Sequence, residues 1–256
     1  MTRTIIVHHH LFKNAGTSFD HALQTSLGDR FTTYERPGRI EPAEIAGFLD
    51  AHPTLAAVSS HNARLPPAVV AGATVVPVIF VRHPLDRVRS VFEFEARQRR
   101  PTPGSQMARQ GDIKDYVRWR LDRAPAGDRA IVDFQVSRLE AAGDGPDELS
   151  RALDAVQRLP FVGLVEAYDD SLRRLWPLVS DIPGLRLDTV RLNATAPAEH
   201  PLPQRLRNLE DRLGRDLTER LISANQGDLV VWETVRGRYS TASTGDVAGR
   251  EPAPCA

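Results

Sequence analysis

The chain has 256 residues, of which 41% are hydrophobic and 26% charged, and its 33 basic side chains balance 33 acidic ones. This composition is ordinary for a globular protein with a sizeable core, in one large α/β domain or two small ones. Zero net charge disfavours a general nucleic-acid-binding surface, no run of about 18 apolar residues could span a bilayer, and a single cysteine, Cys255, excludes disulfide bonds.

The first 100 residues alternate predicted strands with predicted helices. Residues 4–12, TIIVHHHLF, are β-branched and apolar, as in a buried strand, and 19–27 repeat phenylalanine and leucine at helical spacing. A second strand, TLAAVSS, is predicted at 54–60. The clearest strand is TVVPVIFVR at 74–82, and a proline separates it from a helix at 85–98.

The rest of the chain is predicted to be mainly helical. Glycine and proline separate three helices in the middle of the chain, at 112–123, 128–142 and 147–158. Two further strands, FVGLV at 161–165 and RLDTVRLN at 186–193, lie on either side of a helix at 169–179. The closing helices are near 203–213, 214–226 and 228–237.

Apolar strands that alternate with helices indicate a parallel sheet, because each parallel return needs a crossover that covers one face. We therefore expect an α/β fold with a central parallel sheet of about four to five strands and helices on both faces. The fold is expected to occupy residues 1–239 as a single domain. The polar, Pro/Gly-rich stretch 240–256 is expected to be a disordered C-terminal tail.

The turn KNAGTS, between the first strand and its helix, has the composition of an anion-binding loop. At the carboxyl end of a parallel strand, such a turn presents free backbone N–H groups and the positive end of a helix dipole. Gly16 permits close approach of an anion, and Thr17 and Ser18 add hydroxyl donors. The alternative is an ordinary strand-to-helix connection capped by Ser18.

Lysine is rare in this sequence, which favours a special role for the lysine of the turn. Lys13 and Lys114 are the only two, and the other basic residues are arginine. A lysine in so arginine-biased a chain indicates a position that needs a compact point charge. The triphosphatase pattern G-x-x-x-x-G-K-[ST] is absent, since Lys13 precedes its glycine instead of following it.

Two segments resemble the signature motifs of one enzyme family. HLFKNAGTSF resembles the 5′-phosphosulfate loop of the family-2-like sulfotransferases, roughly H-x-P-K-T-x-G-T-S. FVRHPLDRVRSVFEF at 80–94 resembles their 3′-phosphate motif, roughly F-V-R-D-P-x-x-R-x-x-S, and weaker similarities extend the match to about residues 4–235. The resemblance implies a P-loop-like sulfotransferase fold and an enzyme that uses 3′-phosphoadenosine 5′-phosphosulfate (PAPS) as co-substrate.

The resemblance also implies roles for individual residues. The 5′-phosphosulfate loop would consist of Lys13, Asn14, Ala15, Gly16, Thr17 and Ser18. Arg82 and Ser90 would bind the 3′-phosphate, for which the planar guanidinium fork is well suited. An ion pair of Arg82 with Asp86 or Glu93 is the alternative. The chain departs from the motifs at three positions, where it has Phe12, Asn14 and His83; none removes a donor that the loop needs, and Asn14 stands where the family has a threonine hydroxyl.

Catalysis would then need a positive charge that stabilises the leaving phosphate and a base that takes the proton of the acceptor hydroxyl. Lys13 is expected to stabilise the bridging oxygen as it leaves. His61, at the end of the second strand, is expected to be the general base, because several members of the family use a histidine from the matching segment. His10 is a second candidate that could orient the loop or line the acceptor side, and a polar strand end is the alternative role for His61.

The histidine triplet is expected to be mainly strand. His8 and His10 share one face of a strand and His9 takes the other. A zinc site would need a third ligand, and the chain has neither an H-E-x-x-H motif nor a cysteine close by. We therefore expect no metal, and transfer from PAPS in this family requires none.

The acceptor is expected to be a hydroxyl, or less readily an amine, of a carbohydrate, lipid or small metabolite. Zero net charge disfavours a long polyanion unless a local arginine stripe receives it. No nucleic-acid partner is expected, and the early polar His8 indicates a cytoplasmic protein without a signal peptide. The alternatives are a nucleotide-dependent kinase on a P-loop-like cradle and a non-catalytic PAPS-binding protein. The sequence does not indicate an oligomeric state.

Overall fold

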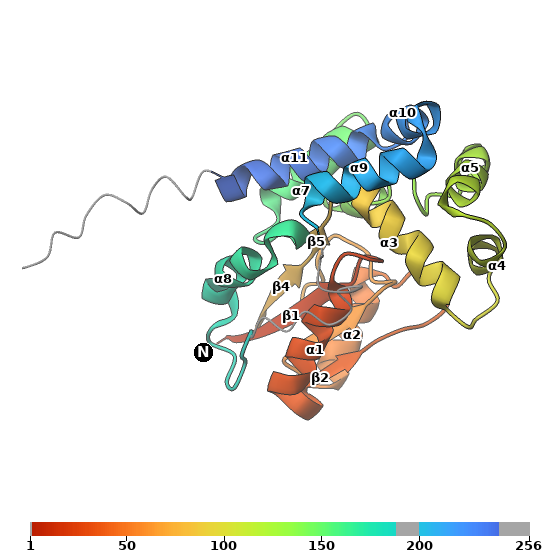
Figure 1. Cartoon of the computed structure of the whole chain (residues 1–256). Coiled ribbons are helices and arrows are strands. Elements are labelled where there is room, and N and C mark those ends of the chain that lie inside the picture. Colours follow the sequence, from red (N-terminus) through yellow and green to blue (C-terminus); the bar gives the residue numbers. More distant parts are fainter. Residues whose placement is uncertain (1, 188–199, 241–256) are drawn as a thin grey trace, which may run out of the picture.

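The computed structural model describes residues 2–187 and 200–240 (Figure 1). The strands are β1 (Arg3–His9), β2 (Phe31–Thr33), β3 (Ala57–Ser60), β4 (Ala73–Val78), β5 (Phe80–Val81) and β6 (Gly163–Leu164). Four of them form a parallel sheet in the order β2-β3-β1-β4, and β5, which follows β4 directly, pairs in parallel with β6. The predicted α/β class with a central parallel sheet is confirmed.

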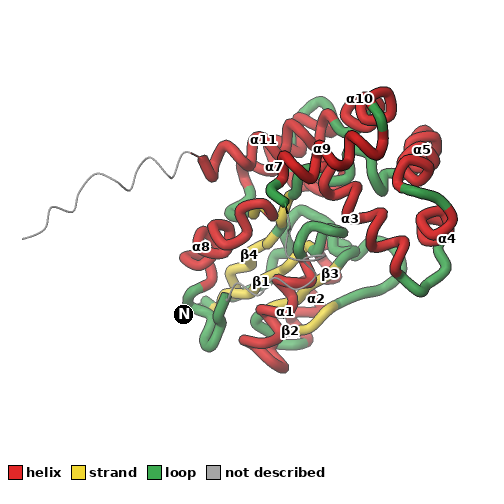
Figure 2. The backbone as a smooth tube through the Cα atoms, viewed as in Figure 1, coloured by secondary structure: helices red, strands yellow, loops and turns green. Residues whose placement is uncertain are grey.

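Eleven α-helices are present in the described ranges. They are α1 (Gly16–Leu27), α2 (Pro42–Ala51), α3 (Pro84–Arg97), α4 (Pro103–Gln110), α5 (Ile113–Arg123), α6 (Val136–Leu139), α7 (Glu148–Arg158), α8 (Tyr168–Val179), α9 (Leu202–Leu213), α10 (Arg215–Ser223) and α11 (Gln226–Ser240). Figure 2 shows α3, α9 and α11 grouped beyond one end of the sheet. None of the helices seen in these ranges is long and apolar enough to cross a bilayer.

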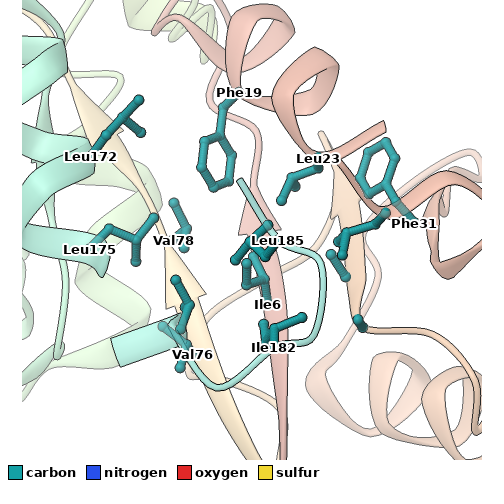
Figure 3. Close-up of a cluster of buried hydrophobic side chains, with 14 of the residues drawn as sticks. Ile6, Phe19, Leu23, Phe31, Val76, Val78, Leu172, Leu175, Ile182 and Leu185 are labelled. Atoms are coloured by element: carbon teal, nitrogen blue, oxygen red, sulfur yellow. The ribbon is translucent and has the colours of Figure 1, made fainter. Parts of the chain in front are cut away.

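Alternating side chains of the strands bury both faces of the sheet. On one face, Ile6, Val76 and Val78 pack against α1 and α8 in a cluster that includes Phe19 and Leu172 (Figure 3). On the opposite face, the next residues along the strands pack against α2, and this second cluster consists of Ile5, Val7, Ile45, Leu49 and Val58 with their neighbours. Helices therefore cover both faces, as the sequence predicts.

Some predicted elements differ from the structure. The predicted helix 128–142 is reduced to α6 and one 3₁₀ turn, Glu140–Ala142. In its place, side chains satisfy the backbone: Asp228 accepts from the N–H groups of Gln135 and Val136 at 3.1 and 2.8 Å. Long-range hydrogen bonds of this kind leave no periodic pattern in the sequence.

Other differences concern the ends and the short elements. Strand β2 and helices α2 and α4 were not predicted, and the predicted strand 74–82 is divided into β4 and β5. Residues 186 and 187 are not strand, while the remainder of the predicted strand 186–193 and residues 241–256 of the expected tail lie outside the described residues. Helix α11 extends to Ser240, one residue into that expected tail.

Candidate functional site

The loop after β1 has the backbone conformation of an anion cradle. Lys13 and Ala15 both have left-handed φ angles, 66° and 61°, with Asn14 between them outside that region. Such alternation turns successive N–H groups toward one side and makes a concavity for an anion. Left-handed residues other than glycine carry strain, which the surrounding structure must hold in place. The loop is therefore specified by its contacts rather than by glycine.

Helix α1 begins at Gly16 and leaves donors open toward the loop. The N–H groups of Ser18 and Phe19 bond the Ala15 carbonyl at 3.1 and 3.3 Å. Over the described ranges, no recorded hydrogen bond uses the N–H of Gly16 or Thr17, and the Thr17 side chain is exposed. Open N–H groups in the first turn of a helix bind anions.

The Asn14 side chain points into the protein and anchors the loop. Its Nδ2 donates to the Phe80 carbonyl at 2.7 Å and to Gln135 Oε1 at 2.8 Å. Gln135 in turn bonds the backbone N–H and carbonyl of Arg82 at 2.7 and 3.0 Å. In this arrangement Asn14 holds the loop against β5, and its side-chain donors are already used.

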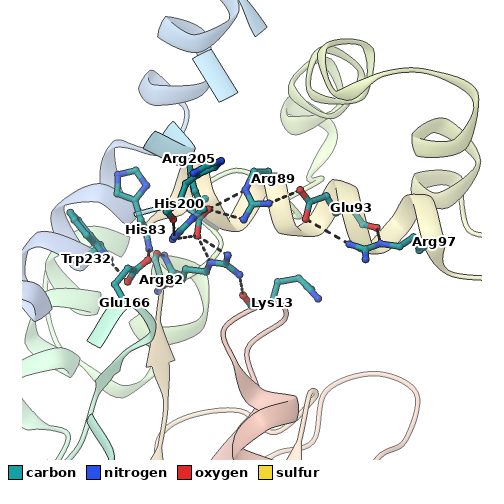
Figure 4. Close-up of polar contacts among 12 residues, drawn as sticks. Lys13, Arg82, His83, Arg89, Glu93, Arg97, Glu166, His200, Arg205 and Trp232 are labelled. Carbon is teal, nitrogen blue, oxygen red and sulfur yellow. Dashed lines mark hydrogen bonds and ion pairs between the residues drawn. The ribbon is translucent and has the colours of Figure 1, made fainter. Parts of the chain in front are cut away.

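Arg82 joins the loop to α3 (Figure 4). Its Nη1 donates to the Lys13 carbonyl at 3.0 Å, and its Nε and Nη2 donate to Asp86 at 2.9 and 2.6 Å. The ion pair considered as an alternative role for Arg82 is thus present. Arg89 and Arg205 also bond Asp86, and this positive surrounding holds the pKa of Asp86 well below its ordinary value. Arg89 also pairs with Glu93, so the three guanidinium groups exceed the two carboxylates by one positive charge.

Lys13 and Ser90 are the other predicted ligand-binding residues of the loop and of α3. Lys13 Nζ lies 4.8 Å from the centre of the Phe94 ring, and partial burial together with Arg82 lowers its pKa. Figure 4 shows its side chain extending away from Arg82 along α3. Ser90 lies on the buried side of α3, one turn beyond Asp86, and its hydroxyl has no recorded hydrogen bond to any described residue.

The register of the sheet brings His10 beside His61. His9 pairs with Ser60, and the His10 N–H donates to the Ser60 carbonyl at 2.9 Å. The His10 and His61 rings follow directly, with their centroids 3.9 Å apart and their planes tilted by 42°, and His61 Nδ1 lies 2.9 Å from the His10 carbonyl. Partial burial lowers the pKa of both rings, of which His61 is the more exposed, so the neutral form of each is favoured at pH 7.

Asp20 of α1 forms hydrogen bonds with two of the three histidines, His8 and His10. One carboxylate oxygen lies 2.7 Å from His8 Nδ1 and the other 2.8 Å from His10 Nδ1, and these contacts help to keep the pKa of Asp20 well below its ordinary value. One ligand atom from each residue lies within 4.8 Å of the others, as in a metal site. The hydrogen bonds account for this arrangement, and we interpret the trio as a network that orients His10.

Gly16 is needed because of the His10 ring. A Cβ at Gly16 would lie 2.1 Å from His10 Cδ2 and 2.3 Å from Nε2. The glycine therefore lets an imidazole pack directly against the start of α1. The loop, the helix terminus and the histidine form one unit.

A cavity of about 270 Å³ opens beside this unit. His9, His10 and His61 line it together with the apolar rings of Phe12 and Phe134. His9 is fully buried, and burial lowers its pKa to about 4, so it is also neutral. A small organic molecule in this cavity would lie directly next to His61.

The loop after β1 and the turn after β5 lie at the place where open α/β sheets bind ligands. From β1 the chain continues toward β3 and β2, whereas from β4 and β5 it continues toward β6 on the other side. The crevice between strands whose connections diverge in this way is the usual ligand site. The Lys13 loop and Arg82 border it, and the bond from Arg82 to the Lys13 carbonyl crosses it.

Comparison with known proteins gives one full-length relative. A protein of Archaeoglobus fulgidus is 34% identical over 250 residues, which cover 93% of this chain and 98% of that protein. The chain belongs to the family of this archaeal protein. The archaeal relative is described as an uncharacterized protein, and no family model matches the chain. This relative therefore indicates no activity, and a function has to be inferred from the site.

The site residues predicted from the sequence form two groups in the structure. In one group, Arg82 contacts the carbonyl of Lys13, which Gly16 and Thr17 follow in the loop; in the other, His61 lies against His10. Four further residues contribute to the site and were not predicted from the sequence: Asp20, Arg89, Gln135 and Arg205. Two of them lie in segments that resemble the sulfotransferases: Arg89 in residues 80–94 and Gln135 in DFQVSRL at 133–139.

Proposed function

We propose that the chain is a sulfotransferase that moves the sulfuryl group of PAPS to the hydroxyl of a small acceptor. The observation that carries the proposal is the left-handed Lys13–Gly16 loop, which opens α1 beside a histidine-lined cavity. The two sequence motifs that resemble those of sulfotransferases supply the loop and the arginine at the end of β5, and these two segments are in contact.

The residues present fit the anionic ends of PAPS. The open N–H groups of Gly16 and Thr17 and the charge of Lys13 would bind the 5′-phosphosulfate. Arg82 and the hydroxyl of Ser90 would bind the 3′-phosphate, with the excess positive charge around Asp86 in support. When bound, PAPS supplies an activated sulfuryl group.

Three side chains, those of His61, Lys13 and His10, have separate roles in the transfer. His61 is neutral and its Nδ1 faces the His10 carbonyl, so Nε2 accepts the proton of the acceptor hydroxyl. Lys13 places positive charge where negative charge builds on the leaving phosphate. His10, held by Asp20, packs against Gly16 and keeps the loop in position.

Titration calorimetry with adenosine 3′,5′-bisphosphate and with ATP·Mg²⁺ tests the nucleotide. We expect the bisphosphate to bind more tightly, because only it places a phosphate at Arg82. Lys13→Ala should weaken that binding about tenfold or more, as for a charge-assisted bond. Lys114→Ala is the matched control, since this exposed lysine of α5 is the only other one, and its affinity should equal the wild type.

A transfer assay with PAPS and a mixture of hydroxylated metabolites tests the reaction, with release of the bisphosphate as readout. Tighter binding of ATP·Mg²⁺ than of the bisphosphate would overturn the proposal in favour of a kinase. Tight bisphosphate binding without transfer to any acceptor would instead indicate a PAPS-binding protein without turnover.

A further inference from the structure

The cavity beside His61 has a strongly basic wall. Arg64 and Arg138 both line it, and no ion pair between either of them and a carboxylate occurs in the described ranges. The Nε of Arg64 is buried and has no hydrogen-bond partner among these residues. By contrast, Arg82, Arg120 and Arg205 each bond a carboxylate. The cavity is therefore a place where positive charge is left uncompensated.

A third arginine strengthens this charge. The bridge between Ile40 and Ala63, with Arg64 N–H bonded to the Ile40 carbonyl at 2.8 Å, brings Arg39 next to the cavity wall. Burial and the neighbouring Arg39 lower the pKa of Arg64. Burial, Arg64 and Arg39 together lower the pKa of Arg138 to about 10. Mutually repelling cations at a cavity favour the binding of an anion there.

The acidic groups near this wall are already bound to other donors. The Glu35 carboxylate accepts from the His61 N–H at 2.6 Å and from Asn62 Nδ2 at 3.2 Å. The Glu41 side chain caps the first turn of α2. These bonds hold both carboxylates outside the cavity lining, so neither takes the place of a ligand anion.

We propose that the acceptor is a small molecule carrying an oxyanion, a carboxylate or a phosphate, which Arg64 and Arg138 bind while its hydroxyl faces His61. This rests on the function proposed above and names its substrate class. Arg138 lies 5.0 Å from the centre of the Phe134 ring, which fixes its guanidinium at the wall. A cavity of about 270 Å³ is slightly smaller than typical pockets for drug-sized ligands, so it suits a small metabolite better than a polymer.

The geometry gives each part of such an acceptor a partner. The oxyanion would lie between the two guanidinium groups and accept charge-assisted hydrogen bonds. The hydroxyl gives its proton to His61 Nε2, its oxygen forms the new bond to sulfur, and the bond from sulfur to the phosphate oxygen breaks. The sulfated acceptor and adenosine 3′,5′-bisphosphate are the products, with the proton on His61.

Three matched probes test the oxyanion directly by titration calorimetry on the full chain. They are 4-hydroxybenzoate, its neutral isostere 4-hydroxybenzamide, and 4-hydroxyphenyl phosphate, each measured with and without the bisphosphate. We expect both anions to bind about tenfold or more tightly than the amide. Comparison of the two anions then distinguishes a carboxylate site from a phosphate site.

Arg64→Gln and Arg138→Gln should remove the preference for the anions and leave the bisphosphate affinity at the wild-type value. Arg64→Lys should restore part of the preference. This result would show that the glutamine variants lose it through the missing charge and not through misfolding. Arg215→Gln is the control, because this arginine is 85% exposed on α10. Equal binding of benzoate, phosphate and benzamide probes, no binding of any of them, or variants that keep the preference would each overturn the inference. A chain that prefers the anions but binds no bisphosphate would contradict the proposed function alone.

Discussion

The ring centroids of His10 and His61 lie 3.9 Å apart, with the ring planes tilted by 42°, because β1 and β3 run in parallel and in register to the same edge of the sheet. The carbonyl of one residue lies 2.9 Å from Nδ1 of the other, which fixes the His61 tautomer with Nε2 as the proton acceptor. Two charged rings at this distance would repel each other, so at most one proton is added easily. The pair is thus arranged to accept a single proton.

The pH dependence of transfer follows from this arrangement. Burial and His10 lower the pKa of His61 below its ordinary 6.5, so the neutral, basic form persists to lower pH. We expect the midpoint of the acidic limb of kcat to lie below pH 6.5. His61→Ala should reduce kcat about 10²–10⁴-fold and remove this acidic limb.

The exposed His52→Ala is the control for His61→Ala and should keep the wild-type profile. The bisphosphate affinity should be unchanged in both variants, which separates catalysis from nucleotide binding. If His61→Ala keeps the acidic limb and His10→Ala loses it, the base is His10.

Gly16→Ala should destabilise the protein and weaken bisphosphate binding. The added Cβ would meet the His10 ring at 2.1 Å, and Asp20 restrains that ring from moving aside. We expect a loss of about 1–3 kcal/mol in the free energy of unfolding, measured by urea denaturation. Gly47→Ala in α2 is the matched control, because its Cβ would meet nothing within 4 Å, and it should stabilise by about 0.5–1 kcal/mol. Equal stability of Gly16→Ala and wild type would show that the His10 ring moves aside without cost and would contradict this prediction.

The fold could be predicted where burial leaves a pattern in the sequence. β1, β3, β4 and α1 are apolar at the periodicity of their element, and all were located to within a few residues. Helix α2 carries a weaker signal, a capping box of Glu41 and Glu44 around a proline, and β2 is only three residues long. The segment 128–142 was misassigned because contacts distant in the chain, such as Asp228 with Val136, determine its backbone.

The candidate site was predictable only in part, for the same reason. A short motif such as KNAGTS identifies the loop, and Lys13 and Arg82 are indeed in contact through the backbone of the loop. Arg205 reaches Asp86 from 119 residues away, and no local spacing could indicate it. Whether a polar side chain faces ligand or protein also depends on packing, as the buried amide of Asn14 illustrates.

Asp20→Asn should destabilise the chain by about 1.5–3 kcal/mol at neutral pH, because an amide cannot accept from both His8 and His10. The folded pKa of Asp20 lies below its ordinary 3.8, so its stabilisation is complete above that pH and is lost as pH falls through the folded value. The stability gap between variant and wild type should therefore narrow at acidic pH. Urea denaturation over a pH series measures it, with the exposed Asp50→Asn as control. A gap that does not change with pH would contradict an ionised Asp20.

Arg82→Gln should separate recognition of the 3′-phosphate from positioning of the loop. The guanidinium group bonds both Asp86 and the Lys13 carbonyl, so its loss could act at either place. We expect the affinity for adenosine 3′,5′-bisphosphate to fall about tenfold or more, and that for 5′-AMP, which has no 3′-phosphate, to change much less. Calorimetry with both nucleotides measures the difference, and Arg118→Gln, on the exposed side of α5, is the control. Equal losses for the two nucleotides would make Arg82 a positioning residue of the loop and assign the 3′-phosphate to other groups.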